Sequence, residues 1–288
     1  MTDHPHHLDA HYDAPHVQAG QRLLERLRVA FRNAGRDPDR LTLDETAGID
    51  QLHLGGRRAS RSLAELGGLA PGCRVLDVGC GTGGASRLLA AEFGAQVTGV
   101  DITAAFVAVA EWLSRATGCD ERTRFVCADA ARTALPDGAF DAVWCQHALM
   151  NMPDLTALLA EWQRLLVPGG RVLLHEVVAG GRGEPLALPV PWARCQQTSH
   201  LRTRQALEAR LAESGFVPVT VRDISAAALA WRRKHSHREG PGSGEADPAA
   251  LPGPAVIFGE IFTTMGRNLR DNLAADRVRI LEGVWRRA

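Results

Sequence analysis

The stretch VLDVGCGTGG at residues 75–84 decides the fold of this 288-residue chain. An apolar run ends in a glycine-rich turn, and helical spacing begins directly after the turn. Glycines are needed where the backbone turns tightly and approaches a ligand closely, with helix-terminal N–H groups facing that ligand. The order of strand, glycine-rich turn and helix therefore predicts a cofactor site at the edge of a parallel sheet. Gly79, Gly81 and Gly84 also fit the dinucleotide fingerprint, so the turn alone does not identify the cofactor.

Around this turn, from Gly72 to Val178, apolar strands alternate with amphipathic helices, which predicts βαβ units. The predicted strands are residues 74–78, 96–100, 124–127, 140–145, 171–178, 216–222 and 277–285. The predicted helices are residues 86–93, 104–117, 155–166, 203–214 and 256–273. We therefore expect an α/β fold with a Rossmann-like seven-stranded sheet and helices on both faces.

The ends of the chain predict additions to this sheet. We expect residues 1–60 to form an N-terminal tail and a helical cap, and residues 61–224 to form the core. Residues 225–276 are expected to form a helical lid between the last two strands, with a flexible linker at 235–254 that holds four glycines and four prolines. Residues 277–288 then supply the last strand. The alternative for the inserted segment is a homodimer interface.

Composition excludes several classes of protein. Lys+Arg and Asp+Glu both total 33, so the chain lacks the basic excess that nucleic-acid binding usually needs. No run approaches about 18 apolar residues, and the N-terminus is rich in His and Asp, so we expect neither a membrane span nor a secretory signal. The six cysteines show no metal-ligand spacing, which favours reduced thiols in a cytoplasmic protein without a metal site.

Asp101 ends the second predicted strand, where a carboxylate accepts hydrogen bonds from a ribose diol. NAD(P)-dependent oxidoreductases share this feature with other nucleotide-binding enzymes. An oxidoreductase on the same glycine loop therefore stays open as an alternative, as does a catalytically silent subunit that only binds the cofactor.

The segments that follow resemble those of class I S-adenosylmethionine-dependent methyltransferases. Residues 75–83 are similar to the first motif of that family, and ADA at 128–130 is similar to the segment that flanks adenine. LPDGAFD at 135–141 and LVPGG at 166–170 are similar to later motifs. The resemblance covers roughly Leu52 to Val178 and is strongest to the small-molecule branch with ubiquinone/menaquinone C-methyltransferases and sarcosine/dimethylglycine N-methyltransferases.

This resemblance implies S-adenosylmethionine as the cofactor, in-line methyl transfer to a small metabolite, and antiparallel pairing of the last two strands. The cofactor-binding residues that it implies are Asp77, Gly79, Gly81, Gly83, Asp101, Ile102, Asp129, Ala130 and Gln146.

Ligands of open α/β sheets bind beyond the carboxyl ends of the strands, so residues after the fourth and fifth strands are expected to face the substrate. QHALMNM at 146–152 departs from the Asn/Asp-Pro-Pro-aromatic tetrapeptide of DNA and glutamine amide methyltransferases. His147 is the candidate general base, because an imidazole accepts a proton near neutral pH. The alternative is that His147 only hydrogen-bonds the loop or the cofactor. The candidate substrate contacts are His53, Asn151, Glu176, Trp192 and His200.

Overall fold

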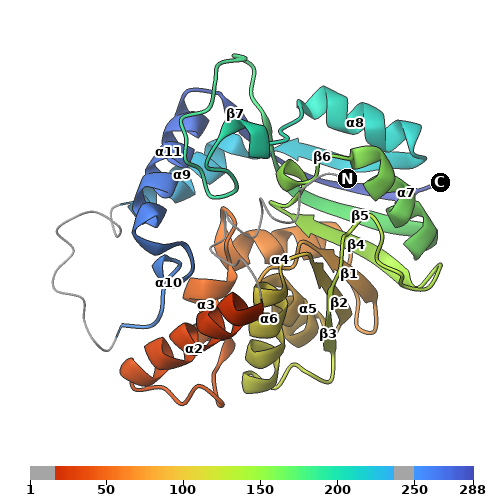
Figure 1. Ribbon diagram of the computed structural model, residues 1–288. Coiled ribbons are helices and arrows are strands. Elements are labelled where there is room, and N and C mark those ends of the chain that lie inside the picture. Colours follow the sequence, from red (N-terminus) through yellow and green to blue (C-terminus); the bar gives the residue numbers. More distant parts are fainter. Residues whose placement is uncertain (1–16, 237–249) are drawn as a thin grey trace.

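The computed structural model describes residues 17–236 and 250–288 (Figure 1). Seven strands form one sheet in the order β3-β2-β1-β4-β5-β7-β6, which confirms the predicted seven-stranded sheet. The strands are β1 (Arg74–Val78), β2 (Gln96–Asp101), β3 (Thr123–Cys127), β4 (Phe140–Gln146), β5 (Leu166–Ala179), β6 (Phe216–Asp223) and β7 (Val278–Arg287). β1 to β5 pair in parallel, and β7 lies antiparallel between β5 and β6.

Helices cover both faces of the sheet, as predicted. The α-helices are α2 (Val17–Asn33), α3 (Leu43–Asp50), α4 (Gly56–Leu66), α5 (Gly84–Phe93), α6 (Ala104–Ala116), α7 (Leu155–Leu165), α8 (Arg204–Glu213), α9 (Ser225–Ser236), α10 (Ala255–Phe258) and α11 (Phe262–Ala274). Side chains alternate along each strand, so Leu76 of β1 packs with α7 and α8 on one face, whereas Val75 packs with α4 and α5 on the other.

The N-terminal cap and the inserted helices share one apolar cluster. Leu27 of α2, Ile49 of α3, Val109 of α6 and Ile257 of α10 are all buried in it. In Figure 1 the blue helix α10 accordingly stands beside the red and orange helices of the cap. This packing places the insertion beside α6, which contacts β2 and β3. Because Ile257 is buried within the chain, it is not available for a contact between two copies.

The insertion departs from its predicted bounds in two places. Gly259, with a φ of +71°, ends α10, so the helix expected at 256–273 is two helices joined by the short helix η3 (Gly259–Ile261). The expected linker also begins later, because His235 still belongs to α9 and its ring stacks on that of Trp231 at 4.0 Å between centroids. Most of the expected linker, residues 237–249, and the His-rich tail at residues 1–16 lie outside the described residues.

The boundary expected between residues 60 and 61 falls inside α4, and the division into cap, core and lid stays a prediction. No helix in residues 17–236 or 250–288 is long and apolar enough to cross a membrane.

Candidate active site

A crevice of about 670 Å³ lies beyond the carboxyl ends of β1, β2 and β4. Its volume falls within the range of pockets that bind small ligands. The glycine-rich turn, the ends of β2 and β3, and the segment after β4 line it from the sheet side. The cap, the loop after β5 and helix α10 close it from outside. The crevice therefore sits where the sheet topology predicts a ligand.

The glycine-rich turn borders the crevice through Gly79 and Gly81. Gly79 has a φ of +69°, and a Cβ there would come within 2.5 Å of the Ala148 Cβ, so only glycine fits. Gly81 also has a positive φ, of +52°, and no heavy atom would lie within 4 Å of its Cβ, so its backbone is open to a ligand. Gly83 does not line the crevice; a Cβ there would meet the Phe125 ring at 2.8 Å. The close approach of Phe125 requires a glycine here for packing, and the cofactor contact of Gly83 stays a prediction.

Two carboxylates flank the turn. Asp101 accepts hydrogen bonds from the Gly81 amide and the Thr103 amide, both at 2.9 Å, so it holds the turn while it lines the crevice. Asp77 is buried at the end of β1, and the Ser86 hydroxyl donates to it at 2.6 Å. Burial, together with the neighbouring Asp101, raises the pKa of Asp77 to about 7, against the lowering effect of Ser86.

The other predicted cofactor residues, Ile102, Asp129, Ala130 and Gln146, also line the crevice. The Gln146 Oε1 accepts hydrogen bonds from the Trp144 indole at 3.1 Å and the Ser60 hydroxyl at 3.2 Å. Its Nε2 is buried and has no hydrogen-bond partner among the described residues. A buried donor without a partner is costly, so this amide suits a site in which a ligand supplies the acceptor.

Three histidines meet at one end of the crevice. The rings of His147 and His175 stack with 5.0 Å between centroids and an interplanar angle of 18°. The His53 ring lies 6.0 Å from that of His147 and 5.8 Å from that of His175. His53 and His147 line the crevice, and His175 is buried behind them.

Burial keeps these three imidazoles uncharged. It holds the pKa of His147 well below its usual value, and the neighbouring His175 and His53 lower it further. The pKa of His53 is lowered mainly by burial, and that of His175 falls to about 3 through burial and the nearby His53. At neutral pH all three rings are therefore uncharged. Within the described part of the chain, no group of three or more His, Cys, Asp or Glu residues is arranged to hold a metal ion.

Glu176 holds the turn that carries His147. The turn begins at His147, whose φ is +51°, and the His147 amide donates to the His175 carbonyl at 2.9 Å. The next two amides, of Ala148 and Leu149, donate to the Glu176 carboxylate at 3.2 and 3.3 Å. Glu176 is 0% exposed and does not line the crevice, and its substrate contact stays a prediction. Burial raises its pKa to about 7.

The other candidate substrate contacts fall into two groups, those that line the crevice and those that do not. Asn151 and Trp192 line the crevice, and their contact with a substrate stays a prediction. The Trp192 indole N–H donates to the Ser199 hydroxyl at 2.9 Å. His200 lies outside the crevice, and its amide donates to the Met150 carbonyl at 2.7 Å; its substrate contact stays a prediction. Sequence reasoning missed Phe258 of α10 as a crevice residue, because it lies 79 residues beyond the end of β5 at Ala179 and its neighbours carry no motif.

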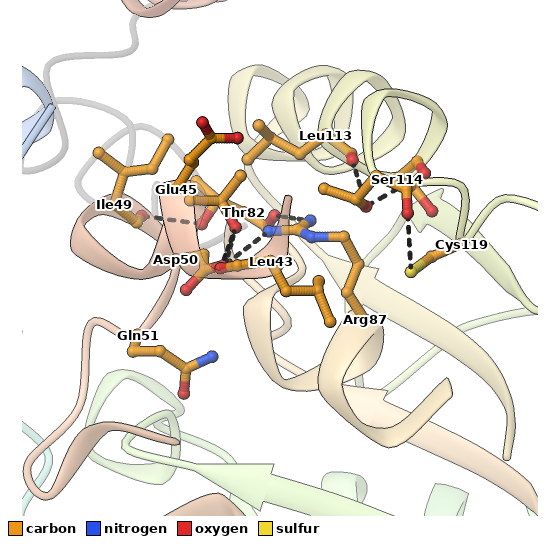
Figure 2. A network of polar contacts seen from close by, with 12 residues as sticks. Leu43, Glu45, Ile49, Asp50, Gln51, Thr82, Arg87, Leu113, Ser114 and Cys119 are labelled. Carbon is orange, nitrogen blue, oxygen red and sulfur yellow. Dashed lines mark hydrogen bonds and ion pairs between the residues drawn. The ribbon is translucent and has the colours of Figure 1, made fainter. Parts of the chain in front are cut away.

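A buried ion pair, also missed, ties the cap to the glycine-rich turn (Figure 2). The Arg87 guanidinium of α5 lies 3.1 Å from the Asp50 carboxylate of α3, and these side chains are 0% and 1% exposed. Arg87 also donates to the Thr82 carbonyl at 2.7 Å, and the Thr82 hydroxyl donates to the Ile49 carbonyl at 3.1 Å. The Thr46 hydroxyl donates to Asp50 at 2.7 Å. This network fixes α3 over the start of α5.

Comparisons with known proteins agree with this geometry. Residues 76–174 match the family described as "Methyltransferase domain". "Methyltransferase GfsG" of Streptomyces halstedii is 33% identical over 164 residues, which are 57% of this chain and 58% of that protein. The 2-methyl-6-phytyl-1,4-hydroquinone methyltransferase of Synechocystis sp. is 43% identical over 118 residues, which are 40% of this chain and 36% of that protein. The matches thus span less than two thirds of these relatives.

A solved structure extends the similarity of fold to the whole chain. Haemonchus contortus phosphoethanolamine N-methyltransferase 2, in complex with S-adenosyl-L-methionine, superposes with a TM-score of 0.71 and 19% identity. The superposition covers 100% of this chain and 60% of that chain. At this identity the similarity shows a shared fold.

Proposed function

We propose that the chain transfers the methyl group of S-adenosylmethionine to a small molecule, because residues 76–174 match a methyltransferase domain. The observation that carries the proposal is the glycine-rich turn, open at Gly81 and bonded to Asp101, at the head of a crevice within the matched domain. When bound there, S-adenosylmethionine supplies a methyl group on a good leaving group. Asp101 and Ile102 would face the ribose, and Asp129 and Ala130 the adenine.

The chain's own residues then align the reactants. Proximity and alignment supply about 7–11 kcal/mol of the barrier in well-oriented reactions, so the main task of the crevice is to hold the acceptor in line with the methyl group. His147, uncharged and facing the crevice, is placed to take the proton that the acceptor loses. Glu176 fixes the turn that carries His147. A cytoplasmic location and a homodimer stay predictions.

A binding experiment separates this function from an oxidoreductase. Tryptophan fluorescence of the full chain is titrated with S-adenosylhomocysteine and, separately, with NADH. We expect a saturable change with S-adenosylhomocysteine and none with NADH; tight binding of NADH alone would refute the proposal. Methyl transfer from labelled cofactor to a component of a host extract, read by mass spectrometry as one added methyl group, would exclude a catalytically silent subunit.

Replacing Asp101 by asparagine will weaken S-adenosylhomocysteine binding about 10- to 150-fold. The change removes the charge that strengthens hydrogen bonds from a ribose diol, and a hydrogen bond to a charged group contributes about 1.5–3 kcal/mol. Calorimetry measures the effect. The matched control is Asp141→Asn, because Asp141 pairs with Arg74 away from the crevice. Equal affinity of the Asp101 variant and the unsubstituted chain would place the ribose elsewhere.

Binding of S-adenosylmethionine will strengthen as the pH rises through about 7. Asp77, whose pKa is raised to about 7, is protonated below this pH and ionised above it, and an ionised carboxylate favours a ligand with sulfonium and ammonium charges. Below pH 7 the affinity should fall by up to about tenfold per pH unit, since binding then releases a proton. Calorimetry from pH 5.5 to 8.5 measures this, and Asp77→Asn should flatten the profile. A flat profile in the unsubstituted chain would contradict the assignment.

A further inference from the structure

We infer that the Asp50 carboxylate binds a primary ammonium group in the crevice, and that the amino-acid end of the cofactor supplies this group. The inference rests on the proposed function, since it assigns one more residue of the chain to S-adenosylmethionine. It follows from one buried carboxylate oxygen, from the charges that line the crevice, and from the place of Asp50 beside the glycine-rich turn.

Only one carboxylate oxygen of Asp50 has hydrogen-bond partners within the described residues. The Thr46 hydroxyl donates to Oδ2 at 2.7 Å, and the Arg87 guanidinium donates to the same oxygen at 3.1 Å (Figure 2). Oδ1 is buried and is the only buried carboxylate oxygen of the described residues without a partner. A carboxylate accepts hydrogen bonds at both oxygens, and a buried acceptor without a donor is costly. Because Asp50 lines the crevice, a bound ligand can supply the missing donor.

The ion pair with Arg87 presents its anionic member to the ligand. Asp50 lines the crevice, whereas Arg87 does not, and the Arg87 side chain is 0% exposed. Arg87 also donates to the Thr82 carbonyl at 2.7 Å, so it is fixed behind the turn. Arg87 therefore orients the Asp50 carboxylate and leaves Oδ1 for a donor from the ligand.

The charges around the crevice favour a cationic ligand. Among the described residues, five carboxylates line the crevice and Arg132 is the one arginine or lysine that does; the carboxylates are those of Asp50, Asp77, Asp101, Asp129 and Asp154. Backbone amides donate to Asp101, Asp129 and Asp154. The Ser86 hydroxyl donates to Asp77. A cleft lined by an excess of one charge attracts a ligand of the opposite charge, and S-adenosylmethionine carries a sulfonium and an ammonium group.

Contacts with the glycine-rich turn place Asp50 next to the position proposed for the ribose. The Gly81 amide donates to Asp101, which would face the ribose. The next residue, Thr82, donates to the carbonyl of the residue before Asp50 at 3.1 Å. The Asp50 carbonyl itself lies so close to Gly84 that a Cβ there would come within 1.9 Å of it. In the cofactor, the group that continues from the ribose is the amino-acid chain, so this chain is the part that would reach Asp50.

Gln146 offers the complementary group. Its Nε2 is a buried donor without a partner among the described residues, and Gln146 lines the crevice. The Ser60 hydroxyl lies 3.2 Å from the Gln146 Oε1 and 3.3 Å from the Oε1 of Gln51, the residue after Asp50, so the two sites are neighbours. One site lacks a donor and the other lacks an acceptor. An ammonium and a carboxylate on the same carbon satisfy both, which favours an amino-acid group over a simple amine.

Two ligands that differ by one ammonium group test the inference. Calorimetry compares S-adenosylhomocysteine with its deaminated analogue, 5′-deoxy-5′-(3-carboxypropylthio)adenosine, on the unsubstituted full chain and on Asp50→Asn. We expect the unsubstituted chain to bind S-adenosylhomocysteine at least about tenfold more tightly than the analogue, because a hydrogen bond to a charged group is lost. In Asp50→Asn this ratio of affinities should fall at least about threefold.

The ratio separates a contact with the ammonium from support of the fold. A residue that only holds the cap would weaken both ligands alike, so a smaller fall of the ratio in Asp50→Asn overturns the inference and leaves the proposed function intact. Failure of S-adenosylhomocysteine to bind the unsubstituted chain overturns both.

A second variant covers the case in which Asp50→Asn does not fold, since that change leaves Arg87 buried without its counter-ion. The double variant Asp50→Leu, Arg87→Met has no unpaired charge at this position and should lower the ratio to the same extent. Recovery of the full ratio in the double variant overturns the inference. Asp44→Asn is the matched control on the same helix and should keep the ratio, because Asp44 pairs with Arg57, is 95% exposed and does not line the crevice.

An ammonium group on the methyl acceptor is the other source of the same chemistry. In that case Asp50→Asn would leave the ratio for the two adenosyl ligands unchanged. It would instead weaken the binding of an amine probe, benzylammonium, to the chain saturated with S-adenosylhomocysteine. This combination of results overturns the assignment of the ammonium to the cofactor. We expect the opposite, a lower ratio and no effect on benzylammonium.

Discussion

Replacing His147 by asparagine will lower the turnover number about 10²- to 10⁴-fold and leave the affinity for S-adenosylhomocysteine within about threefold. A positioned general base contributes a factor of this size to a proton transfer. Asparagine is the substitute of choice because it tolerates the positive φ of +51° at this position and cannot accept the proton as an imidazole does. Single-turnover kinetics with any acceptor that the unsubstituted chain methylates measures the effect.

The pH profile distinguishes a base from a structural histidine. Because burial lowers the pKa of His147, the ring stays uncharged below pH 6.5, and the acid limb of kcat should lie below that value. His200→Asn is the control, since His200 lies near the same loop but outside the crevice. If His147→Asn keeps full turnover at neutral pH, His147 only hydrogen-bonds the loop or the cofactor, and the base must be sought elsewhere.

The fold was predictable from local patterns. The apolar run within residues 74–78 and the helical spacing after Gly84 each identify one element, and the alternation of such elements predicts a parallel sheet. The bounds of β5 were harder to predict, because Leu166 to Gly170 form a glycine-containing segment that pairs with β4 only through an irregularity in register. The break at Gly259 depends on a positive φ, which sequence spacing does not reveal.

The positions of Asp77 and Asp101 were also predictable, because both lie at the carboxyl ends of predicted strands. The positions of the histidines were less so. His175 and Glu176 are neighbours in one strand, so they point to opposite faces, and only His175 reaches the histidine cluster. Strand alternation could have separated them. No spacing connects Phe258 with the crevice, or Asp50 with Arg87, because those contacts arise only when distant elements pack.

Replacing Arg87 by methionine will lower the free energy of unfolding by about 3–5 kcal/mol. The change leaves the Asp50 carboxylate buried without its cation, and breaking a buried pair from one side has a cost of this size. It also removes the donor to the Thr82 carbonyl, so the cap should loosen over the glycine-rich turn. Denaturant unfolding followed by circular dichroism measures the loss.

Two further variants show whether the loss of stability in Arg87→Met comes from the uncompensated charge of Asp50. The double variant Asp50→Leu, Arg87→Met should recover most of the lost stability, because replacing a buried pair by apolar side chains is often neutral. Arg61→Met is the control, because Arg61 pairs with Glu92 on the surface, where 46% and 32% of the two side chains are exposed. This substitution should lower the free energy of unfolding by no more than about 1 kcal/mol. If Arg87→Met lowers the free energy of unfolding as little as Arg61→Met does, the ion pair of Asp50 with Arg87 does not hold the cap. Weaker S-adenosylhomocysteine binding in Arg87→Met, recovered in the double variant, would show that cap docking over α5 shapes the cofactor site.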